Sequence, residues 1–390
     1  MTVRSDLARA ADRGLTRRRF LVGTGSLAAM ALIGCGSDSS SGKPAMRAAA
    51  ARVDGDLNLF TWEAYVPDAV IAGFEREYGV KVKQTYFSTE EELLKKLASG
   101  LPFDMAFIAS NYLTRAVEAN LLRPVDRDAM EHRDEILPAF ETAGYEPADD
   151  RQNAKNAQYV GVPYALGGVG MSWLTDRVGE RVDDSFSALW ELAAGKARRH
   201  AFLFDDPQFT IAAALAKSGK SINATSSADL DAAAEALLEI KPHLAGFGPM
   251  TITPQLVNGE GWIQMGYPGD TYQALEQVKH PERIRWQQAR ESGVFNNDNG
   301  VIPAAAKHPG TATVFMDWLL RPRNMRQVVE QIGYIVPTRA GVRAYNDLTA
   351  DYPFLRADEQ LIQNFDDWLG TLRGPALQLW QQTWTRVKAG

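Results

Sequence analysis

The stretch LNLFTWEAYVPDAVIAGFEREYGVKV, residues 57–82, holds a strand, a turn, a helix and the start of a second strand in immediate succession. The apolar run Leu57–Phe60 predicts the first strand, and Pro67 predicts the first turn of a helix whose apolar residues recur every four positions. Gly79 ends the helix, and alternating apolar and polar residues predict a strand over 80–87. This order predicts an α/β sheet with parallel strands covered by helices.

Two large aromatic residues and a carboxylate stand between that first strand and its helix. They are Trp62, Glu63 and Tyr65. One interpretation is that the aromatic rings cap the core. The other is that they line a pocket at the carboxyl end of a strand, where α/β proteins place ligands.

The alternation of strands and helices continues along the chain. Thr89 and Glu92 form a capping-box pattern for a helix through Ala98, and FDMAFIA, residues 103–109, predicts a buried strand. After an irregular polar stretch over 138–160, a second series of strands and helices follows, and we expect the last part of the chain to be mainly helical.

Residues 1–35 are expected to be a targeting segment. Arg17–Arg19 precede a run of small and apolar residues. This run is short and glycine-rich, which favours a secretory signal over a membrane span. Thr16–Leu21 fits the twin-arginine export pattern. Leu32–Cys35 resembles the bacterial lipobox, in which the cysteine is acylated, although an ordinary thiol is the alternative for Cys35.

The composition of residues 36–390 indicates which kinds of ligand and partner the chain can bind. Residues 36–55, rich in Ser, Gly and Ala, predict a flexible tether. Cys35 is the only cysteine, so the chain has no internal disulfide and no cysteine-rich zinc site. Removing residues 1–35 removes six arginines and two aspartates, which changes the net charge from −6 to −10. An acidic exported protein is a poor nucleic-acid binder and a suitable host for cations, although solubility alone also explains the charge.

Enzyme signatures are missing from the sequence. It has neither a G-x-S-x-G elbow nor an H-E-x-x-H pair, and the glycines within 167–170 lack dinucleotide-binding spacing and instead indicate a crossover hinge. We expect no enzyme, no metal and no cofactor, although two acids brought together by folding would suit a hydrolase. The five histidines are interpreted as surface residues: His132, His200, His243, His280 and His308.

A collinear series of short motifs resembles the periplasmic spermidine/putrescine-binding proteins, the solute receptors of polyamine ABC transporters. The opening stretch is similar to the family's first strand, aromatic turn and helix. Further matches are FDMAFIASNYL, VPYALGGVGMSW, MGYPGDTYQA, VIPAAAKHPGTATVFMDWLLRP and QIGYIVPT, in that order along the chain.

The resemblance implies an α/β clamp of two domains, similar to type II periplasmic binding proteins. Each domain is expected to be a mixed sheet flanked by helices, with the ligand in the cleft between them and closure by a hinge motion. On this basis residues 56–160 and 268–305 form domain I, and residues 161–267 and 306–390 form domain II. We expect a monomer.

The family's site residues transfer to this chain one by one. Trp62 and Tyr65 match the aromatic residues of the opening turn. Tyr267 falls on a family Trp and Asp270 on the Asp beside it, although Asp270 would also suit a helix cap near Thr271. Asp298 matches a second acid that binds ligand. A polyamine needs such carboxylates for its ammonium groups and aromatic faces along its chain.

Several positions depart from the family pattern. The family's acid in the opening turn falls on Ala64, so that Glu63 either replaces it or is a solvated surface residue. Asp206 lies in a loop that supplies acids in relatives, and Ser110 lies near a family hydroxyl. The remaining positions carry other residues than the family does: Gln208 or Phe209 for a Glu, Leu166 for a Trp, and Asn296 and Asn297 for aromatic residues. Burying an ammonium group without its partner costs several kcal/mol, so fewer acids would weaken spermidine binding.

The sequence therefore predicts a lipid-anchored receptor outside the cytoplasmic membrane that passes a polyamine or related amine to an ABC permease. Two alternatives share the cleft: a receptor for an amino-acid-derived or carboxylate-bearing solute, and a sensor for a membrane signalling partner.

Overall fold

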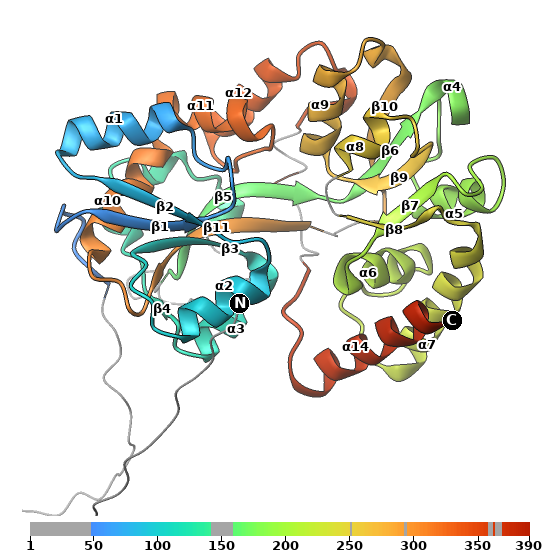
Figure 1. Ribbon diagram of the computed structural model, residues 1–390, viewed down its shortest axis with the longest axis horizontal. Coiled ribbons are helices and arrows are strands. Elements are labelled where there is room, and N and C mark those ends of the chain that lie inside the picture. The colour runs from blue at the N-terminus through green and yellow to red at the C-terminus, as the bar shows by residue number, and fades with distance from the viewer. Residues whose placement is uncertain (1–47, 142–158, 250–251, 292–294, 358–361, 363–368) are drawn as a thin grey trace, which may run out of the picture. The chain divides into compact units, whose positions relative to one another are not determined.

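The computed structural model describes residues 48–141, 159–249, 252–291, 295–357, 362 and 369–390. Within residues 46–390, which form one compact unit, the strands build two mixed sheets with helices packed against them (Figure 1). The predicted signal peptide, the predicted lipobox and the first part of the predicted tether lie outside the described residues. None of the described helices is long and apolar enough to cross a membrane.

The first sheet has the strand order β2-β1-β3-β11-β4, and β5 also pairs with β11. β1 is parallel to β2 and β3, whereas β11 runs antiparallel to β3, β4 and β5. Its strands are β1 Leu57–Thr61, β2 Val82–Tyr86, β3 Met105–Ala109, β4 Leu122–Arg123, β5 Gly161–Gly168 and β11 Phe295–Pro303.

The second sheet has the strand order β10-β6-β9-β7-β8. β7 is parallel to β8 and β9, and β6 is antiparallel to β9 and β10. Its strands are β6 Gly170–Leu174, β7 Ala201–Phe204, β8 Gly246–Gly248, β9 Ile263–Gly266 and β10 Ile284–Gln288.

Each sheet has its own hydrophobic core. The helices whose buried residues belong to the first core are α1 Asp68–Tyr78, α2 Glu90–Ala98, α3 Ser110–Glu118, α10 Pro309–Leu320, α11 Pro322–Ile332 and α12 Arg339–Leu348. Those of the second core are α4 Thr175–Val178, α5 Phe186–Ala194, α6 Pro207–Lys217, α7 Ser227–Ile240, α8 Thr253–Val257, α9 Pro268–Gln277 and α14 Gly374–Ala389.

This packing differs from the expected division of the chain. β5 and helices α10, α11 and α12, expected in domain II, pack with the first sheet. α9 and β10, expected in domain I, pack with the second sheet. The physical reason is strand pairing: β11 pairs with β3, β4 and β5, so that β5 and the three helices directly after β11 join the first sheet, whereas β10 pairs with β6 of the second sheet.

Local signals in the opening region correspond to the observed elements. Gly79 ends α1 in the left-handed conformation with φ 68°, which favours glycine. The side chain of Thr89 caps α2 by accepting the backbone N–H of Glu92, and the Glu92 carboxylate accepts the backbone N–H of Ser88. The predicted capping box is confirmed, except that Glu92 accepts the N–H of Ser88, one residue before the cap, and not that of Thr89.

The glycines after β5 carry the chain from one sheet to the other. β5 ends at Gly168 and β6 begins at Gly170, so Val169 alone separates strands of different sheets. A Cβ atom on Gly170 would lie 2.1 Å from the carbonyl oxygen of Gln287 in β10. The crossover predicted from these glycines is therefore present, and the close strand pairing explains the absence of a side chain at Gly170.

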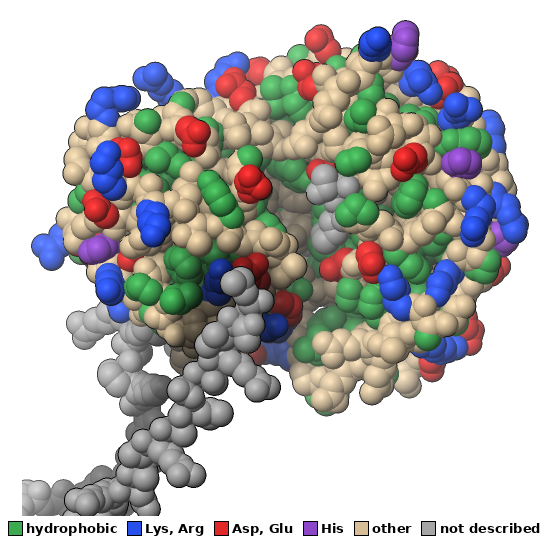
Figure 2. All heavy atoms as spheres, viewed as in Figure 1, with side chains coloured by type: hydrophobic (Ala, Val, Ile, Leu, Met, Phe, Trp, Pro, Cys, Tyr) green, Lys and Arg blue, Asp and Glu red, His purple; other side chains and the backbone are tan. Residues whose placement is uncertain are grey.

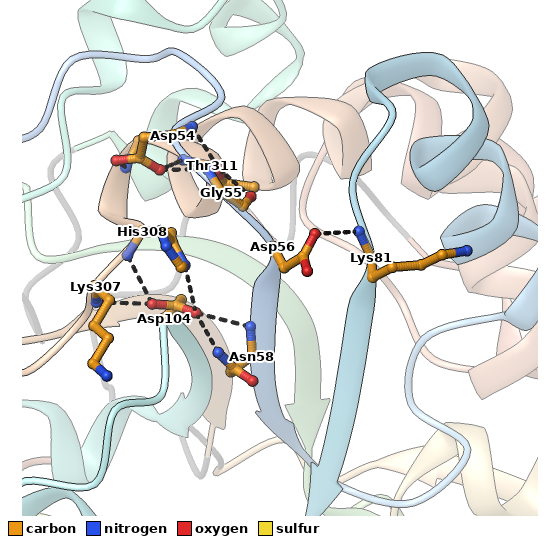
Figure 3. A network of polar contacts seen from close by, with 10 residues as sticks. Asp54, Gly55, Asp56, Asn58, Lys81, Asp104, Lys307, His308 and Thr311 are labelled. Carbon is orange, nitrogen blue, oxygen red and sulfur yellow. Dashed lines mark hydrogen bonds and ion pairs between the residues drawn. The ribbon is translucent and has the colours of Figure 1, made fainter.

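The end of the predicted tether is fastened to the first core. The carboxylate of Asp54 accepts the backbone N–H groups of Gly310 and Thr311 at the start of α10, and the Thr311 hydroxyl accepts the backbone N–H of Asp54 (Figure 3). Nearby, Asp104 accepts the backbone N–H groups of Asn58 and His308. The expectation of a free tether up to residue 55 is therefore wrong for Asp54 and Gly55, because both contact Thr311.

Candidate functional site

The predicted site residues gather where strands of both sheets end. Trp62 and Tyr65 follow β1, Tyr267 and Asp270 follow β9, and Asp206 follows β7. Asp298 joins them because β11 runs antiparallel to β3 and places Asp298 opposite Ala109, at the carboxyl end of β3. Figure 2 shows the surface hollowed between the elements of the two sheets, with acidic side chains along that hollow.

Asp298 is the acid of the first sheet. Its Oδ2 atom accepts a 2.6 Å hydrogen bond from the Tyr65 hydroxyl. Burial raises the pKa of Asp298 to about 6, and hydrogen bonding from Tyr65 and Trp62 opposes that rise. The Trp62 ring packs on Phe87 with 4.3 Å between centroids, which fixes the indole beside the carboxylate.

A β-bulge in β5 brings a third aromatic residue, Tyr164, into contact with Tyr65. The pairing of β5 with β11 shifts between Asp298 and Asn299, and Tyr164 is the extra residue of β5. Its hydroxyl donates a 2.7 Å hydrogen bond to the backbone carbonyl of Tyr65, and its ring lies 5.1 Å from the ring of Tyr65. Tyr164 therefore fixes the position of Tyr65 and, through it, the donor to Asp298.

Asp270 is the buried acid of the second sheet. It is 4% exposed, and its Oδ1 atom accepts a 2.9 Å hydrogen bond from the Tyr334 hydroxyl. Its Oδ2 atom has no hydrogen-bond partner among the described residues. Burial raises the pKa of Asp270 to about 7, and the bond from Tyr334 opposes that rise. The alternative role as a helix cap is wrong, because α9 begins at Pro268 and shows no side-chain cap.

Tyr267 lies among three carboxylates. Its pKa is well above the ordinary value, first because of burial and then because Asp206, Asp270 and Asp298 all disfavour the phenolate. The Tyr267 ring stacks on Phe204 at 5.3 Å and lies 6.1 Å from the ring of Tyr334. Acids from both sheets therefore act on a single aromatic ring.

Asp206 has two observed roles. Its carboxylate caps α6 by accepting the backbone N–H groups of Gln208 and Phe209 at 2.8 and 3.0 Å. Burial nevertheless raises its pKa, and these two bonds only oppose that rise. The carboxylate also acts on Tyr112 of α3, whose pKa is raised by burial and then by Asp206 and Glu90.

Two predicted residues have other surroundings. Glu63 is exposed, and no hydrogen bond or ion pair joins it to another residue in the described part of the chain. Ala64 next to it has φ 55°, so the turn is bent at the position of the family's acid. Ser110 is fully buried at the start of α3, and its hydroxyl accepts the backbone N–H of Asn297 at 3.2 Å. The role of either residue in ligand binding stays a prediction.

Gln208, one of the two candidates for the position of a family acid, instead connects the two packed regions. Its side-chain oxygen accepts a 2.8 Å hydrogen bond from Asn111 of α3, and its nitrogen donates to the backbone carbonyl of Gly370 at 2.7 Å. The Arg373 guanidinium, just before α14, pairs with Glu118 of α3 at 2.5 Å. Helix α3 thus contacts the second region at two points.

Sequence reasoning missed Glu90, Tyr112, Tyr164 and Tyr334. The helical period would have identified Glu90, because Leu93, Leu94 and Leu97 mark the buried face of α2 and Glu90 lies three, four and seven positions before them. Tyr334 gave no comparable signal, because it belongs to the loop after α11 and reaches Asp270 only in the fold.

None of the five histidines is buried, which agrees with their interpretation as surface residues, and four of them have specific partners. His280 lies 3.0 Å from Glu282. The His200 ring stacks on Trp262 at 4.0 Å, and His308 lies 3.6 Å from Asp104. The His132 Nδ1 atom lies 3.1 Å from Asp317, and together with Glu131 these residues bring possible metal ligands within 4.8 Å of one another.

Four carboxylates of the site share one kind of environment. Asp206, Asp270, Asp298 and Glu90 all have raised pKa values with burial as the main cause. Among the described residues, no lysine or arginine forms a hydrogen bond or ion pair with any of the four. A ligand that brings positive charge would remove the cost of ionising them, and the tyrosine and tryptophan faces would contact its apolar part.

Comparison with known proteins gives consistent matches. The profile of the bacterial extracellular solute-binding proteins matches residues 69–356. The spermidine/putrescine-binding periplasmic protein of Salmonella typhimurium is 25% identical over 347 residues, which cover 88% of this chain and 95% of that protein. The putrescine/cadaverine-binding protein of Pseudomonas aeruginosa is 29% identical over 295 residues, covering 73% and 80%.

A solved structure agrees in fold. The spermidine/putrescine ABC transporter substrate-binding protein of Streptococcus pneumoniae superposes with a TM-score of 0.69 at 20% identity, covering 86% of this chain and 100% of that one. The α/β clamp expected from the sequence is confirmed by this likeness and by the two sheets.

Proposed function

Because the chain belongs to the family of bacterial extracellular solute-binding proteins, we propose that it captures a polyamine or a related cationic amine and delivers it to the permease of an ABC transporter. It is a binding protein and not an enzyme. The proposal extends to this chain the ligand class that the names of its relatives from Salmonella typhimurium and Pseudomonas aeruginosa carry.

The observation that carries this proposal is the set of four carboxylates without a basic partner among the described residues. Asp298 and Glu90 come from the first sheet region, and Asp206 and Asp270 come from the second. An amine that contacts acids of both regions would favour their approach, which is the physical basis for ligand-driven closure. The contacts of α3 with Gln208 and Arg373 are then part of the closed form.

Export and anchoring belong to the same proposal. The twin-arginine pattern at Thr16–Leu21 would direct the chain out of the cytoplasm, and acylation of Cys35 would hold it at the membrane surface as a monomeric receptor. The periplasmic relatives support the location.

The experiment is titration calorimetry of residues 50–390 against putrescine, spermidine and a panel of smaller amines. These residues lie within the compact unit that begins at residue 46. We expect saturable binding with Kd below about 10 μM, which is roughly −7 kcal/mol. No heat with any amine would contradict the proposal and favour a receptor for zwitterions or carboxylates. A sensor would bind a membrane signalling partner in place of a permease. Capture of the permease by the ligand-loaded protein therefore distinguishes transport from signalling.

A further inference from the structure

Glu90 has an unusual position for the first residue of a helix. It follows the cap Thr89, and its Oε1 atom accepts a 3.0 Å hydrogen bond from the backbone N–H of Ala109, where β3 ends. Its Oε2 atom is shielded from solvent and has no hydrogen-bond partner among the described residues. One carboxylate oxygen thus fixes the side chain, and the other remains available for a donor.

A second acid lies beside Glu90, because Oε1 of Glu90 is bonded to the backbone of Ala109 and Asp298 is the residue of β11 that pairs opposite Ala109. Burial raises the pKa of Glu90 well above its ordinary value, and the charge of Asp298 is the next cause. The hydrogen bond from Ala109 only opposes these effects. Two carboxylates with the same charge that share a partly buried place are expensive to ionise together, unless a cation comes between them.

A purely structural role in the helix start does not explain this environment. Glu90, Glu91 and Glu92 all lie in the first turn of α2, where negative charge is favourable. Glu91 is exposed and pairs with Arg115, and the pKa of Glu92 is lowered by its bonds from Ser88 and Lys96. Glu90 is the one of the three that is bonded to the backbone of Ala109, the residue opposite Asp298, and its environment disfavours its charge.

We propose that Glu90 and Asp298 together bind one ammonium group of the ligand, with Oε2 of Glu90 accepting a hydrogen bond from it. The acid that is missing at Ala64 of the opening turn is then supplied from the start of α2. This inference rests on the proposed amine-binding function and adds a residue that determines affinity. The aromatic rings of Trp62 and Tyr65 stand beside the same carboxylate of Asp298.

The test compares Glu90→Gln with Glu91→Gln in the full chain, with putrescine as the titrant. Both variants remove one negative charge from the same helix turn, but only Glu90 belongs to the proposed pair. We expect Glu90→Gln to raise Kd by about tenfold or more, which is about 1.4 kcal/mol, and Glu91→Gln to stay within about twofold of the parent. The glutamine oxygen can still accept the N–H of Ala109, so the fold should be kept.

The outcomes separate this inference from the proposed function. A parent that binds putrescine and a Glu90→Gln variant that binds equally well would overturn the role of Glu90 and leave amine binding intact. A parent that binds no amine would overturn both. The carboxyl carbon shift of Glu90 in the parent gives a readout that does not depend on the variant. Its pKa should fall when putrescine is added, and an unchanged titration would contradict the contact.

Discussion

Tyr65 and Asp298 lie 233 positions apart in the sequence, yet the hydroxyl of Tyr65 is 2.6 Å from Oδ2 of Asp298. The strand β11 returns antiparallel beside β3 and thereby brings the last acid of the site to the turn after β1. The aromatic turn and the acid of the first sheet are therefore one unit, in which the donor stabilises the ionised form of the acid.

Replacing Tyr65 with Phe should weaken amine binding by about fivefold to tenfold, on the order of 1 kcal/mol, because the ionised Asp298 loses a hydrogen bond. Calorimetric titration of the variant with putrescine measures this change. The pH at which affinity is half-maximal should also move upward, because the Tyr65 bond lowers the pKa of Asp298. A downward movement would show that the bond does not favour the carboxylate. Tyr78→Phe, a change on α1, is the control.

Replacing Asp270 with Asn should weaken amine binding by about tenfold or more without destabilising the free protein at pH 8. The pKa of Asp270 is about 7 in the fold, above its unfolded value of about 4, so the folded state binds more protons between these values and loses stability as the pH rises through that window. Asn avoids this loss and can still accept the Tyr334 hydroxyl. Thermal melts at pH 5 and pH 8 check the sign, and a Tm far below the parent at pH 8 would contradict it.

Amine affinity of the parent should fall as the pH is lowered from about 8 to about 5. Bound ammonium groups favour ionised carboxylates, so the ligand must displace the protons that Asp298 and Asp270 hold below pH of about 6 and 7. Binding at pH 6.5 should therefore release protons, which calorimetry in buffers of different ionisation enthalpy measures directly. Affinity that does not change over this range, with no proton release, would show that these acids do not face the ligand.

Replacing Gln208 with Ala should weaken binding by about threefold to tenfold through closure and not through ligand contact. The variant loses the hydrogen bond to Asn111 that connects α3 with the second region, and a bond to Gly370 within that region. Small-angle scattering of the loaded variant should then show a larger radius than the loaded parent. Equal radii and equal affinity would show that this connection does not contribute to closure.

Replacing Cys35 with Ala should release the protein from membranes and leave amine affinity unchanged, because the lipid chain would be attached far from the site in the sequence. Fractionation of cells that express the parent and the variant measures the distribution. Membrane association that persists in the variant would remove the lipidation proposal.

The sequence alone predicted the local elements well and the long-range arrangement less well. The capping box of α2 and the end of α1 at Gly79 depend on neighbouring residues, and both occur as predicted. The place of α10, α11 and α12 depends on how β11 pairs, which no local pattern shows. The same holds for the site. Trp62 and Tyr65 could be recognised because they lie in one turn after the first strand, whereas Tyr334 contacts Asp270 only in the folded chain.

The anchorage of Asp54 on Thr311 sets a geometric limit on where the receptor can work. Nineteen residues lead from Cys35 to Asp54, and at about 3.5 Å per residue their contour cannot exceed roughly 67 Å, whatever path they take. Asp54 precedes β1, whereas the site lies beyond the opposite end of that strand. A lipid at Cys35 would thus hold the receptor near the start of β1, at the end of that strand remote from the site. The mouth of the cleft would stay free to turn toward a permease anywhere within that radius.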